Sequence, residues 1–253
     1  MFPYHDENRT ERTAFVTLAV IAANVAAWLL VQGAGSTLAL ARSVCEYGLI
    51  PGELTGSLPP GTPFPMGEGL VCLTDPGRQV LNVFTSMFMH GSWMHLLGNM
   101  WFLWVFGNNI EDSMWPGRFV VFYLLCGVAA ALLQVAFSPA SRIPMVGASG
   151  AISGVMGAYL VLYPRVRVFA LVPIGLFFTT IALPAWTMLI YWAVIQVLGG
   201  LTGLLAEERG GVAFWAHAGG FAAGLVLIKL FARREDVVAH RARHWEPRRL
   251  YGR

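Results

Sequence analysis

The stretch IPMVGASGAISGVMGAYL, residues 143–160, is apolar enough for a lipid bilayer, yet it contains four glycines and two serines. Glycine lowers the stability of a helix in water, but small residues let two membrane helices approach closely. The stretch therefore predicts a tightly packed membrane helix. Considered alone, Ser149 fits helix packing as well as it fits catalysis.

The whole composition agrees with a membrane protein. Hydrophobic residues make up 56% of the 253 residues and charged residues 12%, against about 25% charged in soluble domains. Six apolar runs approach the roughly 20 residues that a transmembrane helix needs. We expect an all-α membrane protein, a bundle of six transmembrane helices at residues 14–32, 93–110, 119–137, 145–163, 185–205 and 212–230.

This organisation gives one membrane domain, residues 14–231, between an N-terminal tail (1–13) and a basic C-terminal tail (232–253). Residues 34–78 form a long polar loop, and we read no signal peptide at the start. Residues 168–205 are too long for one span and contain Pro173 and Pro184, so they fit either an interfacial stretch and a span, or two spans.

The distribution of arginine decides between these alternatives. Basic residues concentrate on the cytoplasmic side of membrane proteins, and a seventh span would put the basic tail outside. We therefore expect six spans, both termini in the cytoplasm, and the loop 34–78 outside. We expect no nucleic-acid partner, because the tail contains only two aromatic residues, Trp245 and Tyr251, among its arginines. Lys229 is the only lysine among the 17 Lys and Arg residues, which is typical of a GC-rich bacterial genome.

In this topology, four polar residues share one depth. The second, fourth and sixth spans run inward, so Ser149, His217, His95 and Asn99 all lie roughly 5–10 Å below the outer surface at about 1.5 Å per residue. No acidic residue is near Ser149 and His217, so a Ser–His pair is expected rather than a triad. Three alternatives remain: helix packing for Ser149, a core or cofactor-ligand role for His217, and interhelical hydrogen bonds for His95 and Asn99.

Glycines would set the distance between the two helices that carry this pair. Gly150, Gly154 and Gly157 fall on one helical face, and Gly220 and Gly224 lie on the face of His217. Contact between these faces would bring Ser149 Oγ within hydrogen-bond reach of His217.

We expect neither a metal site nor a cofactor. The chain has no HExxH motif, and His90 and His95 are five residues apart, about 140° around a regular helix. Cys45 and Cys72 both fall in the outer loop, where a disulfide is possible because the compartment is oxidising.

Three motifs together resemble the rhomboid intramembrane serine proteases: HGSWMHLLGNMWFLWVFGNNIEDSM (90–114), GASGAISG (147–154) and AHAGGFAAG (216–224). The resemblance implies the family's six-helix core, with Ser149 as nucleophile and His217 as general base. It implies an oxyanion hole from His95, Asn99 and the backbone N–H of Ser149, and structural roles for His90 and Glu111. Ser153 stands where the best-studied relatives have a tyrosine that supports the histidine, which leaves the group that orients His217 unidentified.

The predicted activity is therefore serine endopeptidase cleavage of single-span or other membrane proteins near the outer face of a bacterial inner membrane. Two alternatives are a non-catalytic rhomboid-like protein that binds other membrane helices and, ranked last, a transporter that uses His217 as a proton relay. The sequence does not indicate the oligomeric state.

Overall fold

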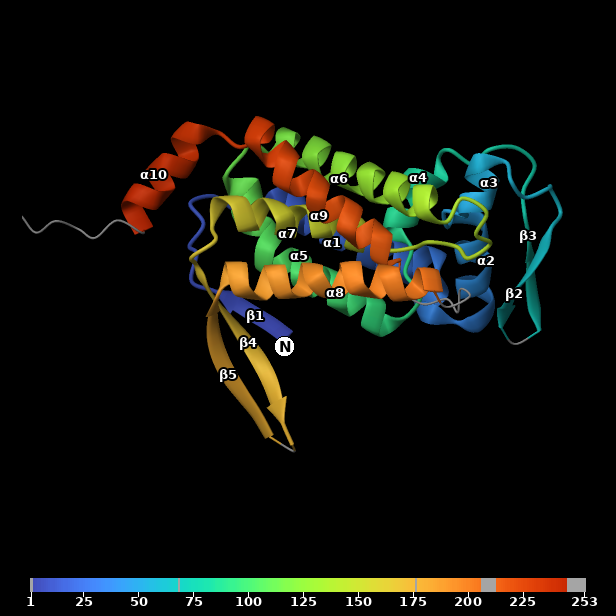
Figure 1. The fold of residues 1–253 in the computed structure, drawn as a ribbon, viewed down its shortest axis with the longest axis horizontal. Coiled ribbons are helices and arrows are strands. Elements are labelled where there is room, and N and C mark those ends of the chain that lie inside the picture. The colour runs from blue at the N-terminus through green and yellow to red at the C-terminus, as the bar shows by residue number, and fades with distance from the viewer. Residues whose placement is uncertain (1, 68, 176, 206–212, 245–253) are drawn as a thin grey trace, which may run out of the picture.

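The computed structural model describes residues 2–67, 69–175, 177–205 and 213–244. Long helices run along the longest axis of the molecule (Figure 1). They follow the six predicted spans: α1 (Phe15–Ala26, continued by the π-helical turn Ala27–Val31), α5 (Trp93–Asp112), α6 (Pro116–Phe137), α7 (Ser149–Leu162), α8 (Ala185–Leu205) and α9 (Phe214–Phe231). The fourth helix begins at Ser149 rather than at residue 145, and residue 212 lies outside the described residues.

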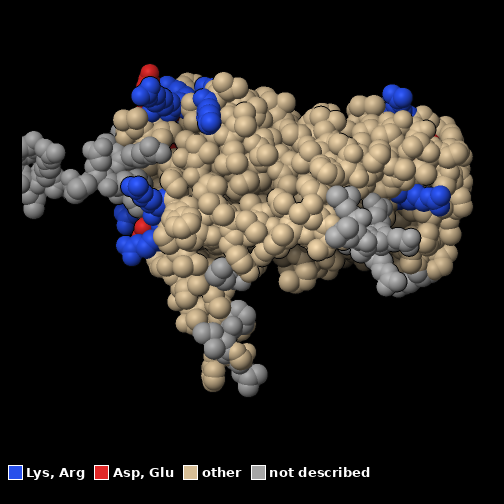
Figure 2. Space-filling view, viewed as in Figure 1, with Lys and Arg blue, Asp and Glu red and all other residues tan. Residues whose placement is uncertain are grey.

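The surface carries the signs of a membrane protein. Among the described residues, α6, α8 and α9 are long and apolar enough to cross a membrane, and two further apolar helices are shorter. Figure 2 shows charged side chains gathered at the two ends of the molecule, with a broad band of uncharged residues between them. This distribution suits a bilayer crossed along the long axis.

Helix α7 lies inside the bundle, packed against α9, and nearly all of its residues are buried. A Cβ atom on Gly220 or Gly224 of α9 would collide with the carbonyl oxygen of Gly150 or Gly154, respectively. A Cβ on Gly157 would collide with the carbonyl oxygen of Phe221. The structure thus brings the predicted glycine faces together, with backbone packed on backbone.

The expectation of an all-α protein is wrong in part. Strands β1 (Phe2–Asp6), β4 (Arg167–Ile174) and β5 (Phe177–Pro184) form an antiparallel sheet in the order β1-β4-β5. The β4–β5 hairpin extends away from the helices (Figure 1) and replaces the interfacial stretch expected before the fifth span. The segment is rich in β-branched and aromatic residues, Pro173 disfavours a helix, and Gly175 takes φ of 60° at the turn.

The predicted outer loop is also structured. It contains α2 (Thr37–Tyr47), α3 (Pro51–Thr55) and the hairpin of β2 (Pro63–Gly67) and β3 (Leu70–Leu73). Short helical turns lie at its start, Gly33–Gly35, and between the loop and α5, at α4 (Asn82–Thr85) and Ser86–Phe88. A disulfide joins Cys45 to Cys72, with 5.8 Å between the Cα atoms.

The same loop is tied to the segment that leads into α7. The backbones of Leu49 and Met145 exchange two hydrogen bonds of 2.9 and 2.8 Å, and Gly52 N–H donates to the Ser141 carbonyl at 3.0 Å. The loop therefore holds residues 141–145 in place before the chain reaches Ser149.

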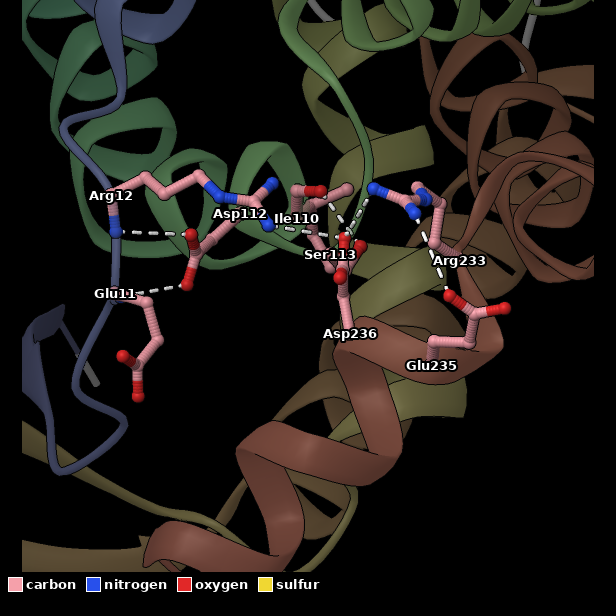
Figure 3. Close-up of polar contacts among 8 residues, drawn as sticks. All are labelled: Glu11, Arg12, Ile110, Asp112, Ser113, Arg233, Glu235 and Asp236. Atoms are coloured by element: carbon pink, nitrogen blue, oxygen red, sulfur yellow. Dashed lines mark hydrogen bonds and ion pairs between the residues drawn. The ribbon is translucent and has the colours of Figure 1, made fainter.

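At the opposite end, acidic side chains join the terminal segments to α5. The Glu111 carboxylate accepts from the N–H groups of Val16 (2.9 Å) and Thr17 (2.7 Å), and so caps the first turn of α1. Asp112 accepts from the N–H groups of Glu11 and Arg12, which precede α1 (Figure 3). Glu111 thus joins the end of α5 to the start of α1, at the end of the molecule opposite Ser149.

The basic tail contains a helix, α10 (Arg234–His244), while residues 245–253 lie outside the described residues. Asp236 of α10 forms ion pairs with Arg12 (3.2 Å) and Arg233 (3.3 Å), and Arg233 N–H donates to the Ser113 carbonyl at 2.9 Å (Figure 3). The two terminal segments thus meet at the end of α5.

Candidate active site

Ser149 and His217 lie at the starts of two helices that pack on each other. Ser149 is the first residue of α7, after a turn at Gly147 with φ of 119°, and His217 is in the first turn of α9. The distance between Ser149 Oγ and His217 Nε2 is 2.8 Å. The predicted pair is therefore within hydrogen-bond distance, as a nucleophile and its base require.

The opposite edge of the His217 ring contacts a residue that the sequence reasoning missed. Gln196 of α8 is 7% exposed, and its Oε1 lies 2.8 Å from His217 Nδ1. Gln196 is the only amide or charged residue of α8. That isolation within an apolar span was the available signal, because polar groups inside a membrane are functional candidates.

Three other residues of α7 and α9 that could orient the His217 ring make their contacts elsewhere. Ser153 Oγ donates to the carbonyl of Ser149 in its own helix at 2.6 Å. Tyr159 donates its hydroxyl proton to Asp6, and the Trp215 ring stacks on Phe137 with 3.8 Å between centroids. The ring of Trp192 lies 5.7 Å from that of His217 and borders it from α8.

His95 and Asn99 of α5 converge on the turn that precedes Ser149. A Cβ built on Gly147 would lie 2.7 Å from His95 Nε2 and 3.4 Å from Asn99 Nδ2. Gly91 N–H donates to His95 Nδ1 at 3.3 Å, which leaves the ring proton on Nε2. Asn99 Nδ2 is buried and has no hydrogen-bond partner within the described ranges. Two donors thus face one small region beside Ser149.

The geometry corrects one expectation about His90. This residue precedes α5, so the angle calculated for a regular helix does not apply, and its ring contacts that of His95 with 5.1 Å between centroids. The His90 backbone exchanges two hydrogen bonds of 2.8 Å with the Gln32 side chain. His90 therefore supports the start of α5 just before His95.

All four predicted site residues line one cavity of about 1510 Å³. Its walls come mainly from α5, α6, α7, α8 and α9 and from the segment 138–147, and α3, α4 and the turn Ser86–Phe88 also contribute. It is large enough for an extended peptide segment to reach Ser149. Trp192, Gly199 and Gly200 of α8 and Phe102 of α5 add apolar surface suited to a membrane-derived ligand.

Comparisons with known proteins point to one family. Residues 77–234, more than half of the chain, match the Rhomboid domain. "Rhomboid protein 1, mitochondrial" of Saccharomyces cerevisiae is 29% identical over 113 residues, which cover 42% of this chain and 33% of that protein. "Rhomboid protease GluP" of Bacillus subtilis is 38% identical over 76 residues, 30% of this chain and 14% of that protein.

"Rhomboid-like protease 5" of Toxoplasma gondii is 30% identical over 155 residues, 58% of this chain and 16% of that protein. The matched region thus spans a third or less of the length of these relatives. The family match itself includes His95, Asn99, Ser149, Gln196 and His217. The chain belongs to the rhomboid family.

Proposed function

We propose that this protein is an intramembrane serine endopeptidase that hydrolyses peptide bonds of other membrane proteins. The observation that carries the proposal is the 2.8 Å hydrogen bond between Ser149 Oγ and His217 Nε2 inside a cavity between apolar helices. The names of its relatives, among them a rhomboid protease, support the same class of reaction.

In the proposed reaction, His217 Nε2 takes the Ser149 hydroxyl proton while Oγ attacks the scissile carbonyl. A tetrahedral intermediate forms and collapses to an acyl-enzyme, and the imidazolium returns its proton to the leaving amine. Water, activated by His217, then releases the acyl group from Ser149. His217 Nε2 therefore carries the proton in both steps, from the Ser149 hydroxyl in the first and from the attacking water in the second.

Three donors would stabilise the negative oxygen of the intermediate. They are the Nδ2 amide of Asn99, the Nε2–H of His95 and the backbone N–H of Ser149. The Ser149 N–H begins a helix and has no acceptor within that helix. Donors fixed in advance in a water-poor site stabilise such charge by a few kcal/mol, about 3–4 for a single donor.

We further propose six membrane spans, with both termini in the cytoplasm of a bacterium and the chain in its inner membrane. The apolar helices and the basic α10 end of the molecule support this orientation (Figures 1 and 2). In it, Ser149 lies near the outer face, where water reaches the acyl-enzyme. A substrate helix must unwind there, because helical carbonyls are already hydrogen-bonded.

Fluorophosphonate labelling tests the proposal without a known substrate. We expect the wild-type protein in liposomes to be labelled on Ser149, and Ser149→Ala and His217→Ala to lose the label. Ser149→Ala should also abolish cleavage of a reconstituted single-span substrate. Full cleavage by Ser149→Ala would contradict the assignment.

The same experiment separates the two other functions. A non-catalytic rhomboid that binds membrane helices would leave the wild type unlabelled while it still captures a single-span protein. A transporter would show solute flux in liposomes without labelling. Loss of labelling in His217→Ala, which keeps the Ser149 hydroxyl, identifies a serine that the histidine activates.

A further inference from the structure

A chain of hydrogen bonds continues beyond the Ser149–His217 pair into α8. His217 Nδ1 and Gln196 Oε1 are 2.8 Å apart, and the Gln196 side-chain amide donates to the carbonyl of Trp192 at 3.3 Å. Within the part of the chain that the structure describes, Gln196 is the only hydrogen-bond partner of Nδ1. The chain thus begins at a backbone carbonyl of α8 and ends at the nucleophile of α7.

The backbone carbonyl fixes the direction of every bond in this chain. A carbonyl oxygen only accepts, so the NH2 group of Gln196 faces Trp192 and its oxygen faces the imidazole. That oxygen also only accepts, so the proton of neutral His217 must be on Nδ1. Nε2 is left with a free electron pair directed at Ser149 Oγ, which is the form a general base needs.

The ring is held on more than one side. Trp192 lies one helical turn before Gln196, and its ring borders that of His217 with 5.7 Å between centroids. Ser153, at the position of the family's tyrosine, donates its hydroxyl instead to the Ser149 carbonyl at 2.6 Å. The support for the histidine therefore comes from a neighbouring helix.

We infer that Gln196 is a positioning residue that completes a hydrogen-bonded triad, Ser149–His217–Gln196, with its third member supplied by α8. This inference rests on the proposed function. A neutral amide suits the site, because a buried, unpaired carboxylate would carry a large desolvation cost within the membrane. The amide fixes the tautomer and tilt of the ring without adding charge.

The test compares two near-isosteric variants of Gln196. Gln196→Met removes the acceptor and should lower the rate constant of fluorophosphonate labelling roughly 10- to 100-fold, by analogy with the loss of the hydrogen bond that orients a metal-binding histidine. Gln196→Glu should recover most of that rate, because its carboxyl, kept protonated by the same desolvation cost, retains an acceptor oxygen for His217 Nδ1. Thr202→Val is the matched control, because Thr202 is an exposed α8 residue whose hydroxyl donates to the Gly199 carbonyl of its own helix.

A spectroscopic readout separates positioning from general packing. NMR of isotope-labelled histidine, with the His217 signals assigned by their loss in His217→Ala, reports which ring nitrogen carries the proton. We expect a protonated Nδ1 in the wild type and a mixture of tautomers in Gln196→Met. Equal melting temperatures of the variants would show that the loss of rate is not a loss of fold.

Two results would overturn the inference: an unchanged labelling rate in Gln196→Met, or a wild-type His217 protonated on Nε2. The first would leave the proposed function standing, since the wild type would still be labelled. A wild type that is never labelled would instead remove the proposed function, and the tautomer measured by NMR would then decide the role of Gln196 separately.

Discussion

Asp6 is a carboxylic acid buried at the end of β1, remote from the candidate active site. Its Oδ2 accepts hydrogen bonds from Asn109 Nδ2 (3.0 Å) and from the Tyr159 hydroxyl. Burial raises the pKa of Asp6 from 3.8 to about 7, because the desolvated carboxylate is disfavoured more strongly than these donors can offset. Between about pH 4 and pH 7, Asp6 is therefore protonated in the folded protein but ionised in the unfolded chain.

This difference makes stability depend on pH. The folded state holds a proton that the unfolded state releases, so the free energy of unfolding should fall as pH rises from about 4 to about 7 and then level off. Asp6→Asn keeps an acceptor oxygen but does not titrate, and should flatten this part of the curve. Thermal unfolding of both proteins between pH 4 and 8 measures it, and identical slopes would contradict the assignment.

Single residues also show how far the sequence could predict the site. Ser149, His217, His95 and Asn99 were identified because each lies in a local motif at a shared depth. Gln196 was missed because it lies 21 residues from His217 on another helix, and only packing brings the two together. The Asp6–Tyr159 contact joins residues 153 positions apart, which no local pattern encodes.

The packing of α7 on α9 is the element-scale feature that sets the distance from nucleophile to base. Gly224→Ala adds one methyl group that would meet the carbonyl of Gly154, which cannot move without displacing α7. We expect a loss of about 1–3 kcal/mol in the free energy of unfolding, as overpacking usually costs. Ser149 labelling should slow as well, because the helices that carry Ser149 and His217 move apart.

Gly117→Ala in α6 is the matched control, because a Cβ at Gly117 has no heavy atom within 4 Å. It should leave both stability and labelling unchanged or raise stability slightly, since alanine favours helix. A Gly224→Ala variant with wild-type stability and labelling would show that the two backbones have room to separate without consequence.

At the same scale, apolar runs predicted the helices well, because a helix that faces lipid must be long and apolar. The sheet was missed for a physical reason. Residues 167–184 are as apolar as a span, and the pairing of β4 with β1 depends on residues more than 160 positions earlier, Phe2 with Leu171 among them. The folded outer loop was missed because short helices and hairpins carry weak periodicity.

For the molecule as a whole, the Cys45–Cys72 disulfide fastens the outer loop on which residues 141–145 depend. Cys45→Ser should lower the free energy of unfolding by about 2–4 kcal/mol, because the unfolded chain loses a cross-link between residues 27 positions apart. Denaturation of the oxidised protein and the variant measures this difference. Mass mapping that finds both thiols free in native membranes would contradict the bond.

The timing of Cys45–Cys72 disulfide formation follows from the redox state of the compartments that the chain passes through. Thiols stay reduced in the cytosol and are oxidised after translocation. In the proposed orientation, newly made chains carry Cys45 and Cys72 as free thiols until their loop has crossed the bilayer. The cross-link then forms on the same side as Ser149, so the segment before the nucleophile is secured only after delivery. Full activity would thus be delayed until the protein has been inserted into its membrane in the proposed orientation.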